Sequence, residues 1–190
     1  MKDINLFPKK DSIFLKKIKS KTDLKKDENC DGYFLQTSES EARRIIDSLK
    51  GKNKIIALQG GDDAFNRRAI ETLKIDYLIS PEGGKKRDTL KQRDSGINHV
   101  TAKEAKRKNI SLVISMSEIR NLQKKEKALR LERIIQNIKV CRKVNCQLKI
   151  ASLTDNKKNT TDEISRKTFG ESLGMSSEQA KDSTNFKTTI

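Results

Sequence analysis

Short apolar segments and segments of helical periodicity follow one another along the chain, an order that few architectures accommodate. Six β-strands are predicted, at residues 3–7, 31–36, 54–59, 75–80, 110–116 and 147–153. Repeated strand–helix units are typical of a parallel sheet with helices packed against it. Such units build either an open doubly wound sheet or a barrel, and a complete eight-stranded barrel typically needs about 250 residues. A barrel of 190 residues would therefore be reduced or irregular.

The helices are predicted from apolar residues that recur on one face. Ala42, Ile45, Ile46 and Leu49 have this spacing, and Ser38 or Ser40 can cap the helix. Further helices are expected at residues 65–73, from residue 98, at 131–141 and at 164–173. We expect residues 1–174 to form a single domain. The polar tail 175–190 is expected to be partly helical, from residue 177, or disordered.

The charge of the chain indicates a polyanionic partner. Lys and Arg number 42 against 26 Asp and Glu, which gives a net charge of +16. Residues 155–190 hold six basic and six acidic side chains, so the whole excess lies in residues 1–154. Two basic segments stand out, 85–108 with a charge of +6 and 120–143 with +7. Nucleic acid is the leading candidate partner.

Several classes of protein are disfavoured by what the sequence lacks. It has neither an apolar run of about 18 residues nor the apolar core of a signal peptide, so we expect a cytoplasmic protein without a membrane partner. Its three cysteines have no CxxC spacing, which argues against a zinc knuckle or a disulfide framework. GxGxxG, P-loop and GxSxG motifs are also missing. A single histidine cannot supply the multi-histidine cluster of a hydrolytic metal site.

In parallel βα folds, ligands gather where strands end and helices begin. Gly60-Gly61-Asp62 lies at such a position and is either a tight turn or a loop that admits a phosphate. The basic loop 85–93 lies at another such position and is either solvated or in contact with RNA. Most charges of segment 120–143 flank an apolar stripe and are expected to be solvated. His99 falls in the first turn of a helix, where the helix dipole favours the neutral imidazole. The candidate contacts to RNA or to a partner are Arg67, Arg68, Lys85, Lys86, Arg87, Arg93, Asn98 and His99.

Four motifs carry a resemblance to a known family. They are Gly60-Gly61-Asp62 with Asn66-Arg67, the strand that ends in Ser80-Pro81, the junction Arg93-Asp94-Ser95-Gly96-Ile97-Asn98-His99, and the helix and strand that follow it. Over roughly residues 30–174 the chain resembles the ribonuclease P protein component 3 family, the archaeal counterpart of the 30-kDa subunit of the eukaryotic enzyme. Two positions depart from the family pattern. Asn5-Leu6-Phe7 stands where relatives often have Asp-Leu-His, and Thr154-Asp155-Asn156 where they have Ser-Asp-Ala.

The resemblance implies an α/β, TIM-barrel-like fold related to the polymerase-and-histidinol-phosphatase barrels. It also implies a non-catalytic role beside the catalytic RNA that removes 5′ leaders from precursor tRNA, together with a smaller protein partner in a hetero-oligomer. The protein would bind no cofactor, and the RNA subunit would require Mg²⁺. Contacts to RNA or to the partner are carried over to Arg67, Arg93, Asn98 and His99, whereas Lys85, Lys86 and Arg87 rest on charge alone.

Two other functions remain open at this point. One is a metal-dependent phosphoesterase of the related barrel superfamily, which would require a His and Asp cluster that the sequence does not supply. The other is a general RNA-binding module that is unrelated to tRNA. An assay of precursor-tRNA processing would distinguish both of these functions from that of a ribonuclease P subunit.

Overall fold

The computed structural model describes residues 2–24, 29–84, 86–89 and 93–186. These residues form seven parallel strands whose order in the sheet is their order in the chain. The strands are β1 (Asp3–Asn5), β2 (Ser12–Ile18), β3 (Gly32–Leu35), β4 (Ile55–Gln59), β5 (Tyr77–Ile79), β6 (Ser111–Ser115) and β7 (Leu148–Ala151). Because every pair is parallel, all seven carboxyl ends lie at one rim.

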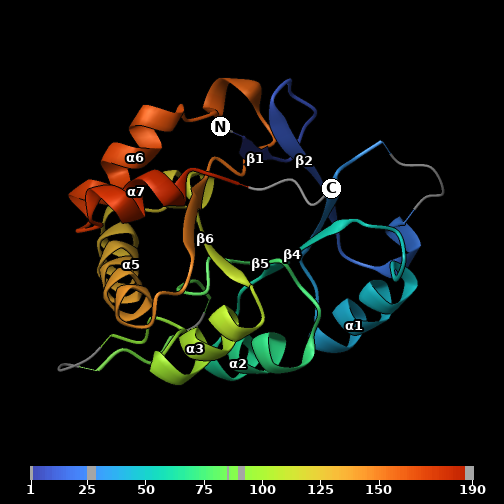
Figure 1. Cartoon of the computed structure of the whole chain (residues 1–190), viewed down its shortest axis with the longest axis horizontal. Helices are drawn as coiled ribbons and strands as arrows, with labels where there is room; N and C mark the ends of the chain where they lie inside the picture. The colour runs from blue at the N-terminus through green and yellow to red at the C-terminus, as the bar shows by residue number, and fades with distance from the viewer. Residues whose placement is uncertain (1, 25–28, 85, 90–92, 187–190) are drawn as a thin grey trace.

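The sheet closes into a barrel between its first and last strands. The backbone N–H of Leu153 donates to the carbonyl of Ile4, and that of Leu6 donates to the carbonyl of Thr154, both at 2.9 Å. The predicted irregular barrel is confirmed, with seven strands in a nearly closed ring (Figure 1).

One strand was missing from the sequence prediction. β2 falls in a short Lys-rich segment of the sequence, where Lys16 and Lys17 interrupt its apolar run and weaken the strand pattern. The six residues between β1 and β2 are also fewer than the dozen or more that usually join parallel strands. The short link suffices because β1 itself has only three residues. The prediction of six strands is therefore wrong by one.

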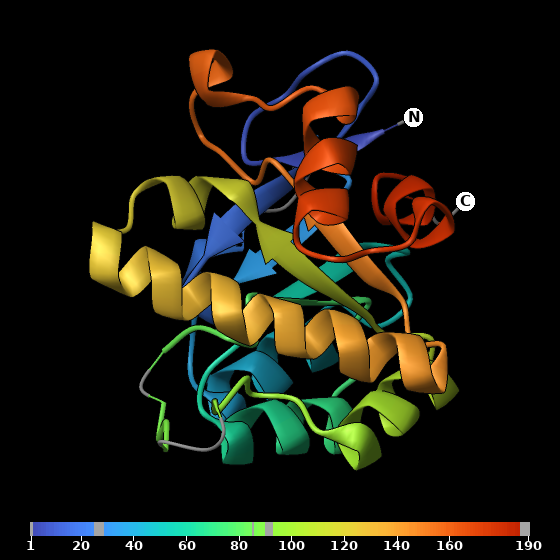
Figure 2. The same cartoon turned by 90° about the vertical axis from the view of Figure 1, so that its left-hand side faces the viewer.

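Helices cover the outside of the barrel, as Figures 1 and 2 show. They are α1 (Glu39–Ser48), α2 (Asp63–Thr72), α3 (His99–Arg107), α4 (Met116–Arg120), α5 (Lys124–Val144), α6 (Glu163–Ser172) and α7 (Ser177–Ser183), with 3-10 turns η1 (Lys21–Asp23) and η2 (Lys157–Asn159). The α1 cap is Ser38, whose side chain accepts a hydrogen bond from the N–H of Glu41. Within the described ranges, no α-helix lies between β1 and β3.

Two apolar clusters follow from the alternation of side chains along the strands. In β4, Ile56 and Leu58 pack outward against the helices, whereas Ile55 and Ala57 belong to the cluster inside the barrel. This burial on both faces explains why the strands read as nearly continuous apolar runs.

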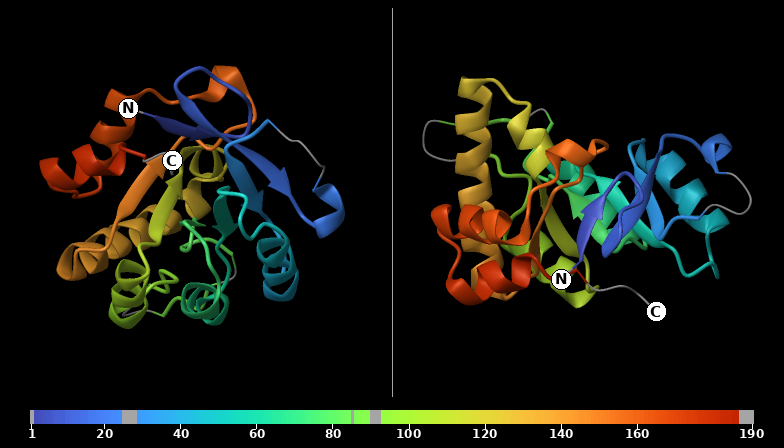
Figure 3. Two further views of the ribbon diagram at one scale, coloured as in Figure 1. Left: turned by 45° about the vertical axis from the view of Figure 1, so that its right-hand side comes forward. Right: turned by 90° about the horizontal axis from the view of Figure 1, so that it is seen from above.

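The last described residues are part of the core. Met175 and Ala180 are buried against the helix layer, and Phe186 lies inside the barrel, where its ring meets that of Tyr77 at 5.8 Å. Phe186 also forms an antiparallel bridge with Lys2, so the first and the last described residues are neighbours (Figure 3). After residue 174 the chain forms the short helix α7, and Phe186 then packs inside the barrel beside the start of β5.

Candidate nucleic-acid interface

The predicted contact residues that the structure describes lie on α2, on the loop after β5 and at the start of α3. Asn98 precedes α3, and its side-chain oxygen accepts hydrogen bonds from the N–H groups of Val100 and Thr101 at 2.9 and 3.0 Å. Asn98 is therefore the helix cap. His99 is the first residue of α3, as predicted, and it is exposed to solvent.

Asn66 ties the loop after β4 to both ends of the loop after β5. Its amide nitrogen donates to the carbonyls of Pro81, Gly96 and Gly61 at 2.9, 3.1 and 3.2 Å, and its oxygen accepts from the N–H of Gly61 at 2.8 Å. The side chain is completely buried. The motif that includes Asn66 therefore holds the loops after β4 and β5 in one arrangement.

Gly96 lets the junction 93–99 approach Pro81, at the start of the loop after β5. Its φ of +76° is favourable only for glycine, and a Cβ at this position would overlap the carbonyl oxygen of Pro81. Behind it, Ser95 is buried, and its carbonyl accepts a hydrogen bond from Asn137 of α5 at 3.1 Å. The junction is thus packed between the rim and α5.

Lys86 differs from what its place in a basic loop suggested. Its side chain is fully buried, and its ammonium donates to the carbonyl of Gly61 at 2.9 Å and to the carboxylate of Asp63 at 3.2 Å. Partial burial and a hydrogen bond with Asp94 raise the pKa of Asp63. A solvated lysine is therefore the wrong interpretation here, and the position of Lys86 does not suit the RNA contact that its charge suggested. Lys85 lies outside the described residues.

The predicted arginines remain accessible although most are paired. Arg67 pairs with Glu71 at 2.7 Å, Arg68 with Glu39 at 2.6 Å and Arg93 with Glu132 at 2.5 Å. The side chains of these arginines are 64, 52 and 38% exposed, so each guanidinium keeps donors for a phosphate. Arg87 is exposed as well. RNA or partner contact stays a prediction for these four arginines and for Asn98 and His99.

Two arginines of α5 turn toward the barrel, whereas the charges of this helix were expected to be mainly solvated. Arg133 pairs with Asp88 at 2.6 Å, and Arg130 lies 3.6 Å from Glu82 and 3.5 Å from Glu118. Both arginine side chains are only 12% exposed. They hold α5 against the loop after β5, which runs beneath α5 in Figure 2.

Glu82 is a buried carboxyl group whose negative charge is not fully balanced by its neighbours. Burial raises the pKa of Glu82 to about 7, against the attraction of Arg130. Its Oε1 atom has no hydrogen-bond partner among the described residues. Glu82 is therefore largely protonated at mildly acidic pH and loses its proton near neutrality.

We expect this carboxyl to make the folded state less stable as the pH rises. The folded state holds the proton up to about pH 7, whereas a glutamate in the unfolded chain releases it near pH 4.5. Raising the pH from 5 to 8 should therefore lower the free energy of unfolding by up to about 3 kcal/mol through this group. Glu82→Gln, which keeps a neutral side chain, should remove that decrease in urea unfolding experiments at the two pH values.

The matched control is Glu118→Gln, which removes the other carboxylate beside Arg130. This variant should keep the decrease that the unaltered protein shows. An equal decrease in Glu82→Gln and in the unaltered protein would contradict the assignment.

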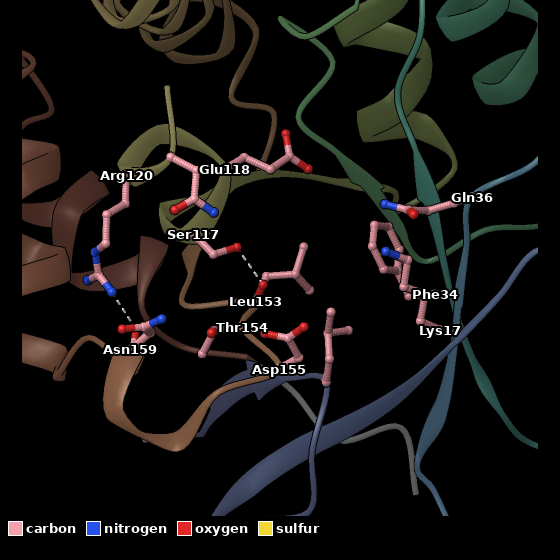
Figure 4. Close-up of a pocket in the computed structure, with 12 residues that line it drawn as sticks. Lys17, Phe34, Gln36, Ser117, Glu118, Arg120, Leu153, Thr154, Asp155 and Asn159 are labelled. Atoms are coloured by element: carbon pink, nitrogen blue, oxygen red, sulfur yellow. Dashed lines mark hydrogen bonds between the residues drawn. The ribbon is translucent and has the colours of Figure 1, made fainter. Parts of the chain in front are cut away.

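A cavity of about 180 Å³ opens at the centre of the rim, over the interior of the barrel. Figure 4 shows Lys17, Phe34 and Gln36 on one side of it and Arg120 with Asn159 on the other. The remaining lining residues are Leu6, Ser117, Glu118, Asn121, Leu153, Thr154 and Asp155. The cavity thus combines apolar, polar and cationic side chains at the place where parallel barrels usually bind ligands.

Sequence reasoning missed the cationic part of this cavity. Lys17 lies on the same face of β2 as Ile13 and Leu15, so it extends from the barrel interior to the rim. It was overlooked because β2 was not predicted. The signal was the alternation of Ile13 and Leu15 with outward residues, ending on a lysine at the carboxyl end.

The described residues contain neither a metal cluster nor a membrane-spanning helix. No group of three or more His, Cys, Asp and Glu side chains in the described ranges could hold a metal ion. None of the helices in the same ranges is long and apolar enough to cross a membrane.

Comparison with known proteins identifies the family. The model of the family RNase P subunit p30 matches residues 32–187. Ribonuclease P protein component 3 of Methanothermobacter thermautotrophicus is 26% identical over 170 residues, which cover 89% of this chain and 66% of that protein. Its counterpart from Thermococcus gammatolerans is 31% identical over 144 residues, 75% of this chain and 64% of that protein. The counterpart from Methanocaldococcus jannaschii is 29% identical over 120 residues, which cover 63% of this chain and 49% of that protein.

The chain therefore spans between 49 and 66% of the length of these three relatives. Among solved structures, a chain in the cryo-EM structure of an archaeal ribonuclease P with mature tRNA is similar, with a TM-score of 0.71 and 21% identity over 96% of this chain and 86% of that one. An amidohydrolase has a TM-score of 0.57 and 11% identity over 83% of this chain and 41% of its own. Both confirm the barrel fold. The family model extends from β3 past α7, and the chain belongs to the RNase P subunit p30 family.

Proposed function

We propose that the chain is a non-catalytic protein subunit of ribonuclease P that assists the catalytic RNA in removing 5′ leaders from precursor tRNA. The observation that carries this proposal is the match of the p30 family model to residues 32–187. Its partners are the catalytic RNA, precursor tRNA and a smaller protein subunit, and the Mg²⁺ that cleavage requires is bound by the RNA.

The charge of the chain supports the same role. A net charge of +16 lowers the electrostatic cost of bringing RNA helices together, because lysine and arginine replace the counterions of the phosphates. The exposed arginines of α2 and of the junction 93–99 lie on one side of the carboxyl rim, beside the exposed start of α3. This rim offers phosphates a set of guanidinium groups on rigid elements.

Reconstitution tests the proposal. The chain is added to the ribonuclease P RNA at limiting Mg²⁺, with and without the smaller protein, and 5′-leader removal is measured. We expect stimulation that weakens as salt rises from about 50 to 200 mM, since phosphate contacts dominate such assemblies. Arg93→Ala and His99→Ala should weaken the stimulation several-fold. The free energy of unfolding should change by less than about 1 kcal/mol, because Arg93 forms an exposed ion pair and His99 is an exposed side chain.

Arg107→Ala is the matched control, because Arg107 also pairs with a glutamate, Glu104, but lies at the other end of α3. It should leave stimulation unchanged. Cleavage of precursor tRNA by the chain alone, with RNA rigorously removed, would disprove the non-catalytic role. Equal affinity for unrelated RNAs, with no effect on processing, would instead favour a general RNA-binding module.

A further inference from the structure

The cavity at the barrel mouth has an apolar floor of the kind that contacts a flat ring. Phe34 and Leu153 belong to the cluster inside the barrel, and Leu6 packs against that cluster. Figure 4 shows Phe34 and Leu153 on either side of the open centre of the cavity. At about 180 Å³ the cavity is smaller than the roughly 300 to 1,000 Å³ typical of drug-sized ligands, so it suits one ring system.

Two side chains at the edge of the cavity, Gln36 and Asp155, offer hydrogen-bond acceptors. The hydroxyl of Ser117 already donates to the carbonyl of Leu153 at 2.6 Å, and the Thr154 hydroxyl is bonded to Asn156. Gln36 uses its amide nitrogen on Gln59, which leaves its carbonyl oxygen as an acceptor. The carboxylate of Asp155 has no hydrogen-bond or ion-pair partner within the described ranges. Gln36 and Asp155 can thus accept N–H groups of a bound ring, and guanine has two adjacent donors on its Watson–Crick edge that match a carboxylate.

Cations stand on opposite sides of this cavity. Lys17 is exposed and has no hydrogen-bond or ion-pair partner among the residues that the structure describes. On the other side, Arg120 spends two N–H groups on Asn159 and Thr161, out of the five that a guanidinium carries. Next to Asn159, η2 adds Lys157 and Lys158, both exposed. A chain of phosphates that crosses the mouth would thus meet positive charge before and after the cavity.

We propose that the barrel mouth binds one unpaired guanine nucleotide of an RNA strand, with the base in the cavity and the flanking phosphates against Lys17 and Arg120. Unpaired RNA bases are commonly recognised in this way, by an apolar or aromatic contact to the ring and hydrogen bonds to its edge. The choice of RNA over a free nucleotide rests on the proposed function and on the placement of cations on both sides. A free guanine nucleotide shares the chemistry of the base and of one phosphate only.

The test measures binding of the purified full chain to three probes: GMP, a single-stranded RNA pentamer with one central guanosine, and the same pentamer with adenosine there. The guanosine pentamer should bind about tenfold more tightly than the adenosine pentamer and also than GMP, since base contacts and added phosphates each contribute. Lys17→Gln should lower the dependence of log affinity on log salt by about 0.7, the value for one phosphate of a single strand. Asp155→Asn should abolish the preference for guanosine.

Lys181→Gln is the matched control, because Lys181 is exposed on α7 and lies away from the mouth. It should bind the guanosine pentamer as the unaltered chain does. Unchanged binding and guanosine preference in both Lys17→Gln and Asp155→Asn would overturn the proposal. GMP that binds as tightly as the pentamer would overturn the assignment to RNA in favour of a free nucleotide.

Reconstituted processing separates this proposal from the proposed function. If the unaltered chain stimulates leader removal but the mouth variants bind the pentamers unchanged, only the mouth proposal fails. If the chain binds the guanosine pentamer through Lys17 and Asp155 but does not stimulate the ribonuclease P RNA, only the subunit role fails.

Discussion

Replacing Gly96 by alanine should destabilise the protein by about 2 to 5 kcal/mol, a large part of the total stability of a typical domain. The backbone φ of +76° costs a residue with a Cβ about 1 to 2 kcal/mol. The new methyl group would also overlap the Pro81 carbonyl oxygen and crowd the Asn66 amide, and overpacking of this kind typically costs about 1 to 3 kcal/mol. Urea unfolding gives the change as a shift of the midpoint at constant slope.

Gly84→Ala is the matched control for the backbone term. Gly84 has a similar φ of +73°, but its nearest neighbour would lie 3.6 Å from an added Cβ. In this variant the free energy of unfolding should fall only by the conformational cost of the backbone, about 1 to 2 kcal/mol. Equal losses in the two variants would show that the contact between the junction and the loop after β5 is not tight.

This contact explains why the junction stands out in the sequence although it does not form a reactive centre. Gly96 and Asn66 are neighbours in space but lie 30 residues apart, and no rule of local pattern pairs them. The sequence predicted where α3 begins and the turn after β4, because each rests on a short motif. What it could not supply was the buried amide that joins the loops after β4 and β5, since that arrangement depends on the nearly closed barrel.

The same reasoning separates the predicted from the missed parts of the fold. Strands such as β4 and β6 were found because burial on both faces makes them continuously apolar. β2 was missed because its last inward residue, Lys17, opens to the rim and need not be apolar. A residue of this kind weakens the strand signal at the position where a parallel barrel exposes its ligand site. The cavity was therefore harder to predict than the barrel.

Closure of the barrel gives the second large effect. Arg166 of α6 is 2% exposed, and its guanidinium lies 2.9 Å from the Asp3 carboxylate of β1 and 3.0 Å from the Ile150 carbonyl of β7. The same carboxylate oxygen accepts hydrogen bonds from the N–H groups of Ile4 and Ser152 at 2.8 and 3.0 Å. The ion pair thus joins the first strand, the last strand and a helix where the sheet closes.

Arg166→Met should lower the free energy of unfolding by about 3 to 5 kcal/mol, because the Asp3 carboxylate would stay buried without its cation. The double variant Asp3→Asn with Arg166→Met should regain a substantial part of this loss, since the asparagine oxygen can still accept from Ile4 and Ser152 while no charge remains. Urea unfolding of both single variants and the double variant completes the cycle and yields the coupling energy between the two side chains.

Arg44→Met serves as the control for loss of an arginine in an exposed ion pair. Arg44 lies on α1, 3.5 Å from Glu41, with its side chain 74% exposed, and its removal should cost less than about 1 kcal/mol. If the losses of the two single variants at Asp3 and Arg166 simply add in the double variant, the carboxylate and the guanidinium do not act together. Closure between β1 and β7 would then depend on the backbone hydrogen bonds of Leu153 and Leu6 rather than on the buried ion pair.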